Sequence, residues 1–256
     1  MKRIHFLTAA VAVLALAGCS KGSGQGNTAA AAADSKVTIT QASPPPGGSW
    51  TDVVNQTTDG YLMGNPNAKV KLIEIASLGC PFCKKFEDEG APTLMNNYVK
   101  SGKVSWEFRP YPIPSHGPVD VAAELIASCN GYKAFFPLAL ALYKDQETWM
   151  GKVEKAPPDK IQQIENLPGS QVLTAIADLA GLPDWAAQRG IPHAKSQQCL
   201  TDQKMIDHFV QVASDVNSDF PDFYGTPSFV LNGKLLGKET GTWAALKPQL
   251  DAAVNG

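Results

Sequence analysis

The segment that most constrains the fold is Cys80–Cys83, with the sequence Cys-Pro-Phe-Cys, which lies between an apolar and a charged stretch. Residues 70–76 are apolar and β-branched, as is typical of a buried strand, and residues 84–89 have helical character. Pro81 suits the first position of a helix, because its missing N–H has no partner there in any case. The sequence therefore predicts a strand, a tight junction and a helix that begins with two cysteines.

Two cysteines at this spacing can close a small disulfide ring at the start of the helix. The sulfur of Cys80 then lies near the free N–H groups of the first helical turn, where the helix dipole favours an anion. A stabilised thiolate is the attacking and leaving species in thiol–disulfide exchange, and its pKa sets how oxidising the disulfide is. The pattern therefore favours redox chemistry at Cys80 and Cys83.

Two other uses of the cysteine pair are weaker. A zinc site needs a second pair of ligands at matching spacing, whereas Cys129 and Cys199 stand alone with only His193 nearby, so we expect no metal. A purely structural disulfide at this spacing closes too small a loop to stabilise the fold much.

Further secondary structure surrounds this motif. Strands are expected at Lys103–Phe108 and at Ser228–Leu231, the latter followed by an Asn-Gly hairpin turn, and a helix at Thr242–Val254. Between these two strands the sequence predicts five helices: Val119–Cys129, Ala134–Tyr143, Asp159–Glu165, Gln171–Ala180 and Lys195–Asn217. A parallel strand pair with a crossover helix, then a hairpin, implies a mixed sheet covered by helices.

The order of strand, Cys-Pro-Phe-Cys, helix, helical insertion and then Gly-Thr-Pro-Ser-Phe at residues 225–229 resembles the DsbA-like thiol-disulfide oxidoreductases. In these proteins a helical domain is inserted into a thioredoxin fold, before the strand that begins at a cis-proline. The resemblance implies an α/β, thioredoxin-like fold with a mixed sheet and an inserted all-helical domain. The expected parts are the first thioredoxin-like part at 51–116, the helical insertion at 117–220 and the second thioredoxin-like part at 221–256.

The family's functional residues carry over to matching positions. Cys80 resembles the exposed nucleophile and Cys83 the buried resolving cysteine. Thr226-Pro227 resembles the cis-proline loop, which faces the disulfide and can pair with a bound peptide, although a plain trans turn is the alternative. The best-known members have His where this chain has Phe82, so one stabiliser of the thiolate is missing and we expect a weaker oxidant.

Glu74 matches a buried acid that lies six residues before the first cysteine in this family. A carboxylate within an apolar strand is costly unless it is protonated or paired. Near Cys83, it could accept and return the proton that the resolving thiol loses. The alternative is a side chain that reaches solvent at the edge of the sheet.

Cys129 and Cys199 both fall in the helical region, where some relatives of the family carry a second disulfide. In an exported protein two leftover cysteines usually pair. We expect a structural disulfide between them, and two buried free thiols are the alternative.

The start of the chain predicts export. Residues 1–18 combine a basic start with an apolar stretch too short to span a bilayer, as in a secretory signal peptide. The stretch ends in Leu-Ala-Gly before Cys19, which resembles a bacterial lipoprotein signal with Cys19 as the lipidated residue; an ordinary cleavage site within residues 29–33 is the alternative. Residues 19–50, rich in Gly, Ser, Ala and Pro, predict a flexible tether.

These features predict an exported thiol-disulfide oxidoreductase, anchored to lipid on the periplasmic side of a bacterial cell envelope. It would form disulfides in exported cysteine-containing proteins without a cofactor, and a membrane protein linked to quinone would reoxidise it. The alternatives are a reductase or isomerase of the same fold, served by a membrane reductant, and a metal-binding lipoprotein that uses the two cysteines. A net charge of −2 disfavours a nucleic-acid partner.

Overall fold

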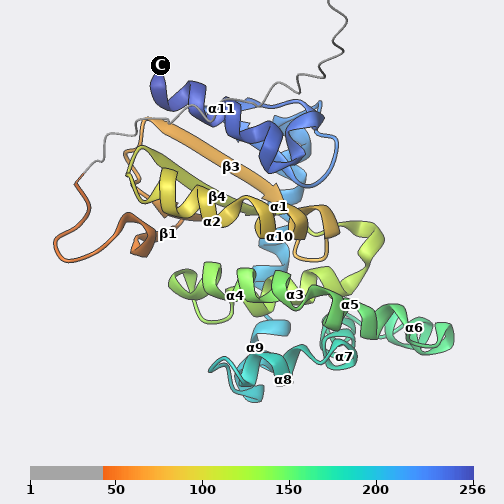
Figure 1. Cartoon of the computed structure of the whole chain (residues 1–256). Coiled ribbons are helices and arrows are strands. Elements are labelled where there is room, and N and C mark those ends of the chain that lie inside the picture. The colour runs from red at the N-terminus through yellow and green to blue at the C-terminus, as the bar shows by residue number, and fades with distance from the viewer. Residues whose placement is uncertain (1–42) are drawn as a thin grey trace, which may run out of the picture. The chain divides into compact units, whose positions relative to one another are not determined.

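The structure is a computed structural model that describes residues 43–256 (Figure 1). The predicted signal peptide, Cys19 and most of the predicted tether lie outside the described residues. The described part begins with a short 3₁₀ helix, η1 (Trp50–Asp52), which Ser49 caps. Within residues 43–256, no helix has both the length and the apolar character needed to cross a membrane.

The sheet has six strands in the order β1-β2-β4-β3-β5-β6. Only β3 and β4 are parallel, so the sheet is mixed, as predicted. The strands are β1 (Val54–Gln56), β2 (Tyr61–Gly64), β3 (Val70–Ala76), β4 (Val104–Pro110), β5 (Ser228–Leu231) and β6 (Lys234–Leu235). The sequence did not indicate β1 and β2, because strands of three and four residues are too short to show a clear alternation.

The strand β3 lies inside the sheet, where Leu72 is paired with both Trp106 of β4 and Leu231 of β5. Leu72 contributes to the main core, whereas Ile75 packs on the other face against Val216. The crossover from β3 to β4 contains α1 (Pro81–Glu89), α2 (Ala91–Thr93) and the π-helical segment η2 (Leu94–Val99). Because β3 is held inside the sheet and α1 begins five residues after its end, β3 determines the position of the start of α1.

The helices between β4 and β5 form a layer below the sheet in Figure 1, and α10 runs from this layer back to the sheet. After the short helix η3 (Pro114–His116), they are α3 (Pro118–Ser128), α4 (Tyr132–Lys144), α5 (Gln146–Glu154), α6 (Pro158–Glu165), α7 (Gln171–Ala180), α8 (Leu182–Ala187), α9 (His193–Leu200) and α10 (Gln203–Asp219). The sheet and these helices belong to one compact unit. The chain ends with η4 (Lys238–Gly241) and α11 (Trp243–Asn255).

One predicted helix is wrong in its extent. The stretch Lys195–Asn217 is divided between α9 and α10, because α9 ends at Leu200 and a new helix begins at Gln203. The carboxylate of Asp202 accepts hydrogen bonds from the backbone N–H groups of the first turn of α10. Such an N-cap starts a helix, and here it divides a continuous helical pattern.

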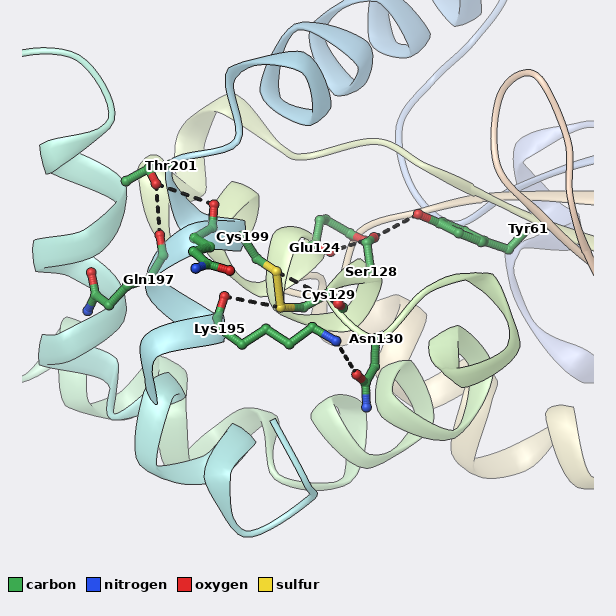
Figure 2. Close-up of a disulfide and its surroundings, with 10 residues drawn as sticks. Tyr61, Glu124, Ser128, Cys129, Asn130, Lys195, Gln197, Cys199 and Thr201 are labelled. Carbon is green, nitrogen blue, oxygen red and sulfur yellow. Dashed lines mark hydrogen bonds between the residues drawn. A yellow bond between two sulfur atoms is a disulfide. The ribbon is translucent and has the colours of Figure 1, made fainter. Parts of the chain in front are cut away.

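A disulfide between Cys129 and Cys199 joins the end of α3 to α9 (Figure 2). Its Cα atoms are 5.6 Å apart, and the two cysteines are separated by 70 residues in sequence. The bond therefore closes a long loop within the helical layer. Cys80 and Cys83 are the free cysteines of the described residues, so the structure represents their reduced form.

Candidate active site

The two free cysteines lie where β3 passes into α1. Cys80 is the N-cap residue of α1, Pro81 occupies the first turn, and the N–H of Lys84 donates to the carbonyl oxygen of Cys80 at 3.0 Å. The predicted strand–motif–helix junction is therefore present. Cys83 lies further along the same turn and is completely buried.

Cys80 is less exposed than expected. The residue is only 2 % exposed, which corrects the expectation of an exposed nucleophile, whereas Phe82 is 68 % exposed. The reason is the loop before β5: the sulfur of Cys80 lies 3.3 Å from the carbonyl oxygen of Thr226, which accepts a hydrogen bond from Cys80 only when the thiol is protonated. The peptide bond between Thr226 and Pro227 is cis, so the alternative of a plain trans turn does not apply.

The surroundings of the two sulfurs give them opposite acidities. Hydrogen bonding from the Cys83 thiol, assisted by the side chain of Thr226 and by the backbone N–H groups of Phe82 and Cys83, lowers the pKa of Cys80 to about 6 although burial opposes this. Burial, reinforced by the neighbouring Cys80, raises the pKa of Cys83 well above its ordinary value. Near neutral pH, Cys80 is therefore mainly a thiolate and Cys83 retains its proton.

Cys80 lines a cleft of about 500 Å³ between the start of α1, the segment before η3, the end of α10 and the loop before β5. Its apolar walls are Phe82, Ile113, Tyr111 and Phe223, and the rings of Tyr111 and Phe223 lie 4.7 Å apart. A cleft with these apolar side chains beside a thiolate can accept an extended peptide segment.

Glu74 lies on β3 and is fully buried. The indole N–H of Trp106 donates to its Oε2 at 3.0 Å, while its Oε1 has no hydrogen-bond partner among the described residues. Burial is the main reason why the pKa of Glu74 is raised to about 8. The alternative of a solvent-facing side chain does not hold, because β3 is an inner strand.

Glu87 is a buried acid that the sequence analysis did not identify. Both of its carboxyl oxygens are buried without a hydrogen-bond partner within residues 43–256. Burial, and then the charge of Glu74, raises the pKa of Glu87 well above its ordinary range. Glu87 follows Cys83 by four residues, so the two side chains lie on one face of α1. This spacing is the feature of the sequence from which the position of Glu87 could have been predicted.

Helices of the insertion hold the loop Ser77–Gly79, which leads into Cys80. The carboxylate of Asp120 on α3 accepts hydrogen bonds from the hydroxyl of Ser77 at 2.6 Å and from the N–H of Gly79 at 2.9 Å. Glu124, one turn later, accepts from the N–H of Leu78 at 3.1 Å. Two acids of α3 thus fix the backbone immediately before the motif.

The next two helices complete this support. The hydroxyl of Tyr143 on α4 donates to the carbonyl oxygen of Ser77 at 3.0 Å. The amide of Gln146 on α5 donates to the carbonyl oxygens of Leu78, at 2.6 Å, and of Cys80, at 3.0 Å. The helical insertion therefore positions the backbone that leads into Cys80. The sequence does not indicate these residues, because such contacts join positions more than 40 apart.

No group of three or more His, Cys, Asp or Glu side chains that could hold a metal ion occurs within residues 43–256.

The fold and the site define a thioredoxin-like protein with a helical insertion and a Cys-Pro-Phe-Cys motif, as predicted. The family model described as Thioredoxin matches residues 56–252, and the chain belongs to this family.

Solved structures agree with this assignment. The crystal structure of a protein-disulfide isomerase from Novosphingobium aromaticivorans is 31 % identical, with a TM-score of 0.71, and the match covers 77 % of this chain and 99 % of that one. The α-DsbA1 of Wolbachia pipientis has a similar fold, with 21 % identity and a TM-score of 0.59, over 79 % of this chain and 94 % of that one.

Curated relatives are more distant. A protein of Rickettsia felis named "Putative protein-disulfide oxidoreductase" is 25 % identical over 201 residues, which is 76 % of this chain and 63 % of the relative. The chain thus spans less than two thirds of the length of the curated relatives that it matches.

Proposed function

We propose that this protein is a thiol-disulfide oxidoreductase that forms disulfide bonds in cysteine-containing proteins by exchange at Cys80 and Cys83. The observation that carries the proposal is the opposite acidity of the two sulfurs, with the pKa of Cys80 at about 6 and that of Cys83 raised. An easily ionised first cysteine is a good leaving group, and a stable reduced form makes the disulfide oxidising. The names of the relatives support the same chemistry.

The cycle begins with the oxidised Cys80–Cys83 pair. A client thiolate attacks the sulfur of Cys80, the Cys80–Cys83 bond breaks, and Cys83 leaves as a thiolate that takes up a proton. A second client thiolate then attacks the client sulfur of the mixed disulfide and releases Cys80 as a thiolate. The client has lost two electrons and two thiol protons, and the Cys80–Cys83 pair is reduced.

The buried acids suit the first of these steps. Cys83 is fully buried, so its proton must come from a neighbouring group, and Glu74 is close enough for its charge to raise the pKa of Cys83. Burial holds a proton on Glu74 up to a pH of about 8. Glu74 therefore supplies the proton, directly or through water.

The cleft suits an unfolded client. Its walls offer apolar contacts of low sequence specificity, and Phe82 is exposed beside Cys80. The loop at Thr226 lies against the sulfur of Cys80 and can pair with the client backbone as an edge strand does.

The cellular setting belongs to the same proposal. We infer export by the signal at residues 1–18, lipid anchoring through Cys19 on the periplasmic side of the envelope, and reoxidation by a membrane protein linked to quinone. Acyl chains on Cys19 would hold the domain near such a partner through the tether. Isotope labelling with a fatty acid tests the anchor, since Cys19→Ala must abolish the label.

The direction of electron flow is tested by equilibrating the purified protein with glutathione buffers and counting the thiols of Cys80 and Cys83. A reduction potential between about −110 and −180 mV supports an oxidase or isomerase, and one near about −270 mV supports a reductase. Isomerase activity remains the second candidate, because the relative from Novosphingobium is named an isomerase. Refolding of a client with scrambled disulfides separates the two, since only an isomerase restores the native pairs.

A further inference from the structure

A histidine outside the cysteine motif shares the cleft with Cys80. His116 ends η3 and lines the same cleft as Cys80 and Phe82, with its side chain 22 % exposed. Its ring lies against the residue that precedes the motif, because a Cβ atom on Gly79 would be only 2.9 Å from His116 Nδ1. Glycine at position 79 is what allows the imidazole to approach the motif.

The inner nitrogen of this imidazole faces a fixed carboxylate. His116 Nδ1 is buried, has no hydrogen-bond partner within residues 43–256, and lies 3.7 Å from Asp120 Oδ2. Asp120 is fully buried and is held in place by hydrogen bonds from Ser77, Gly79 and the N–H of Ile113. The carboxylate of Asp120 faces the imidazole and favours its protonated form.

The charged groups that act on His116 come from three elements. Interaction with Asp120 of α3 is the main reason why the pKa of His116 is raised, and burial opposes it. The charges of Cys80 at the start of α1 and of Glu154 on α5 act in the same direction as Asp120. All three are anionic, so they favour the imidazolium form in the reduced protein.

We propose that His116 is the cationic residue that stabilises the Cys80 thiolate, and that it binds its proton more tightly when the Cys80–Cys83 disulfide is reduced. The proposal deepens the proposed function, on which it rests, since the Cys80 thiolate is the leaving group when the client disulfide is released. In that reaction the client dithiol supplies two electrons, Cys83 keeps one proton, and the charge that remains on Cys80 is balanced by His116.

The direct test is an NMR titration of the histidine rings in the oxidised and the reduced protein. The chain has four histidines, and His116→Gln and His193→Gln assign two of them. We expect the pKa of His116 to be higher in the reduced protein by about half a unit to one unit, because a thiolate has formed nearby. His193, whose side chain is 59 % exposed beside Asp184, should not change and is the internal control. Equal His116 values in the two redox states overturn the proposal.

The reciprocal measurement uses the variants. Coupling between two sites is mutual, so His116→Gln should raise the pKa of Cys80, followed by ultraviolet absorbance of the thiolate, by about the same half to one unit. His193→Gln should leave the pKa of Cys80 unchanged. If His116→Gln also leaves it unchanged, the proposal is wrong. Neither of these pKa measurements depends on activity. A reduction potential typical of a reductase would therefore refute the proposed direction of exchange without refuting the interaction between His116 and Cys80. The titration of the unsubstituted protein decides the matter even if His116→Gln fails to fold.

Discussion

Glu74→Gln should make the folded protein more stable at neutral pH. Burial raises the pKa of Glu74 from 4.5 to about 8, so the folded state binds more protons than the unfolded state between these pH values. The contribution of Glu74 to stability is therefore complete below pH 4.5 and is lost progressively as the pH rises towards 8. At pH 7 the loss is about 3 kcal/mol, from roughly 1.4 kcal/mol per pH unit.

Glutamine has the shape of glutamic acid and no proton to lose. Its amide oxygen can keep the hydrogen bond from Trp106, and its N–H group can donate to Glu87, whose oxygens lack partners among the described residues. The variant should therefore be more stable than the unsubstituted protein by about 3 kcal/mol at pH 7, and by little at pH 4.5.

The assay is urea denaturation of the oxidised protein between pH 4.5 and 8.5, in which both disulfides are closed. Burial, the main cause of the raised pKa, acts in both redox states. Glu89→Gln is the matched control: this side chain is 47 % exposed and paired with Lys85, so its loss should change stability by less than about 1 kcal/mol. The reasoning is refuted if Glu74→Gln has the same stability and the same pH dependence as the unsubstituted protein.

Three further results are expected. Replacing Cys129 and Cys199 by alanine should lower the free energy of unfolding by about 4 kcal/mol, from the chain-entropy cost of a 70-residue separation, and a loss below about 1 kcal/mol in urea denaturation would contradict this. In Cys83→Ser, the Cys80 thiolate should attack the disulfide of an oxidised client peptide, release one peptide sulfur as a thiolate and stay joined to the other, visible as an added mass, whereas Cys80→Ser should trap none. The reduction potential should be more negative than about −120 mV, and Phe82→His should raise it; an unchanged potential in that variant would show that position 82 does not tune the thiolate.

The sequence predicted the parts of the site that are contiguous in the chain. The buried strand before Cys80 and the helix after it are signalled by local periodicity and by Pro81, and the structure has both. The Thr226-Pro227 loop was found through a resemblance, because nothing local indicates that it faces a cysteine 146 residues away.

Other parts needed the three-dimensional arrangement. The edge strands β1 and β2 are too short to show a pattern, and the break before α10 depends on one capping side chain, Asp202. In the sequence, nothing distinguishes Asp120 and Glu124 from ordinary acids of an amphipathic helix. Their role could not be predicted, because their partners include backbone groups of a loop more than 40 residues earlier. Burial itself, which sets the acidity of Glu87, is a property of the folded chain.

The support that α3, α4 and α5 give to Ser77–Gly79 has a consequence for protein engineering. If the insertion were removed, or exchanged for one without these side chains, the loop would lose the acceptors and donors that now satisfy it, namely Asp120, Glu124, Tyr143 and Gln146. A chimera that retained Cys-Pro-Phe-Cys unchanged would therefore not inherit its redox behaviour. The two segments must be transplanted together, and the smallest portable unit of this chemistry is the motif with its three supporting helices.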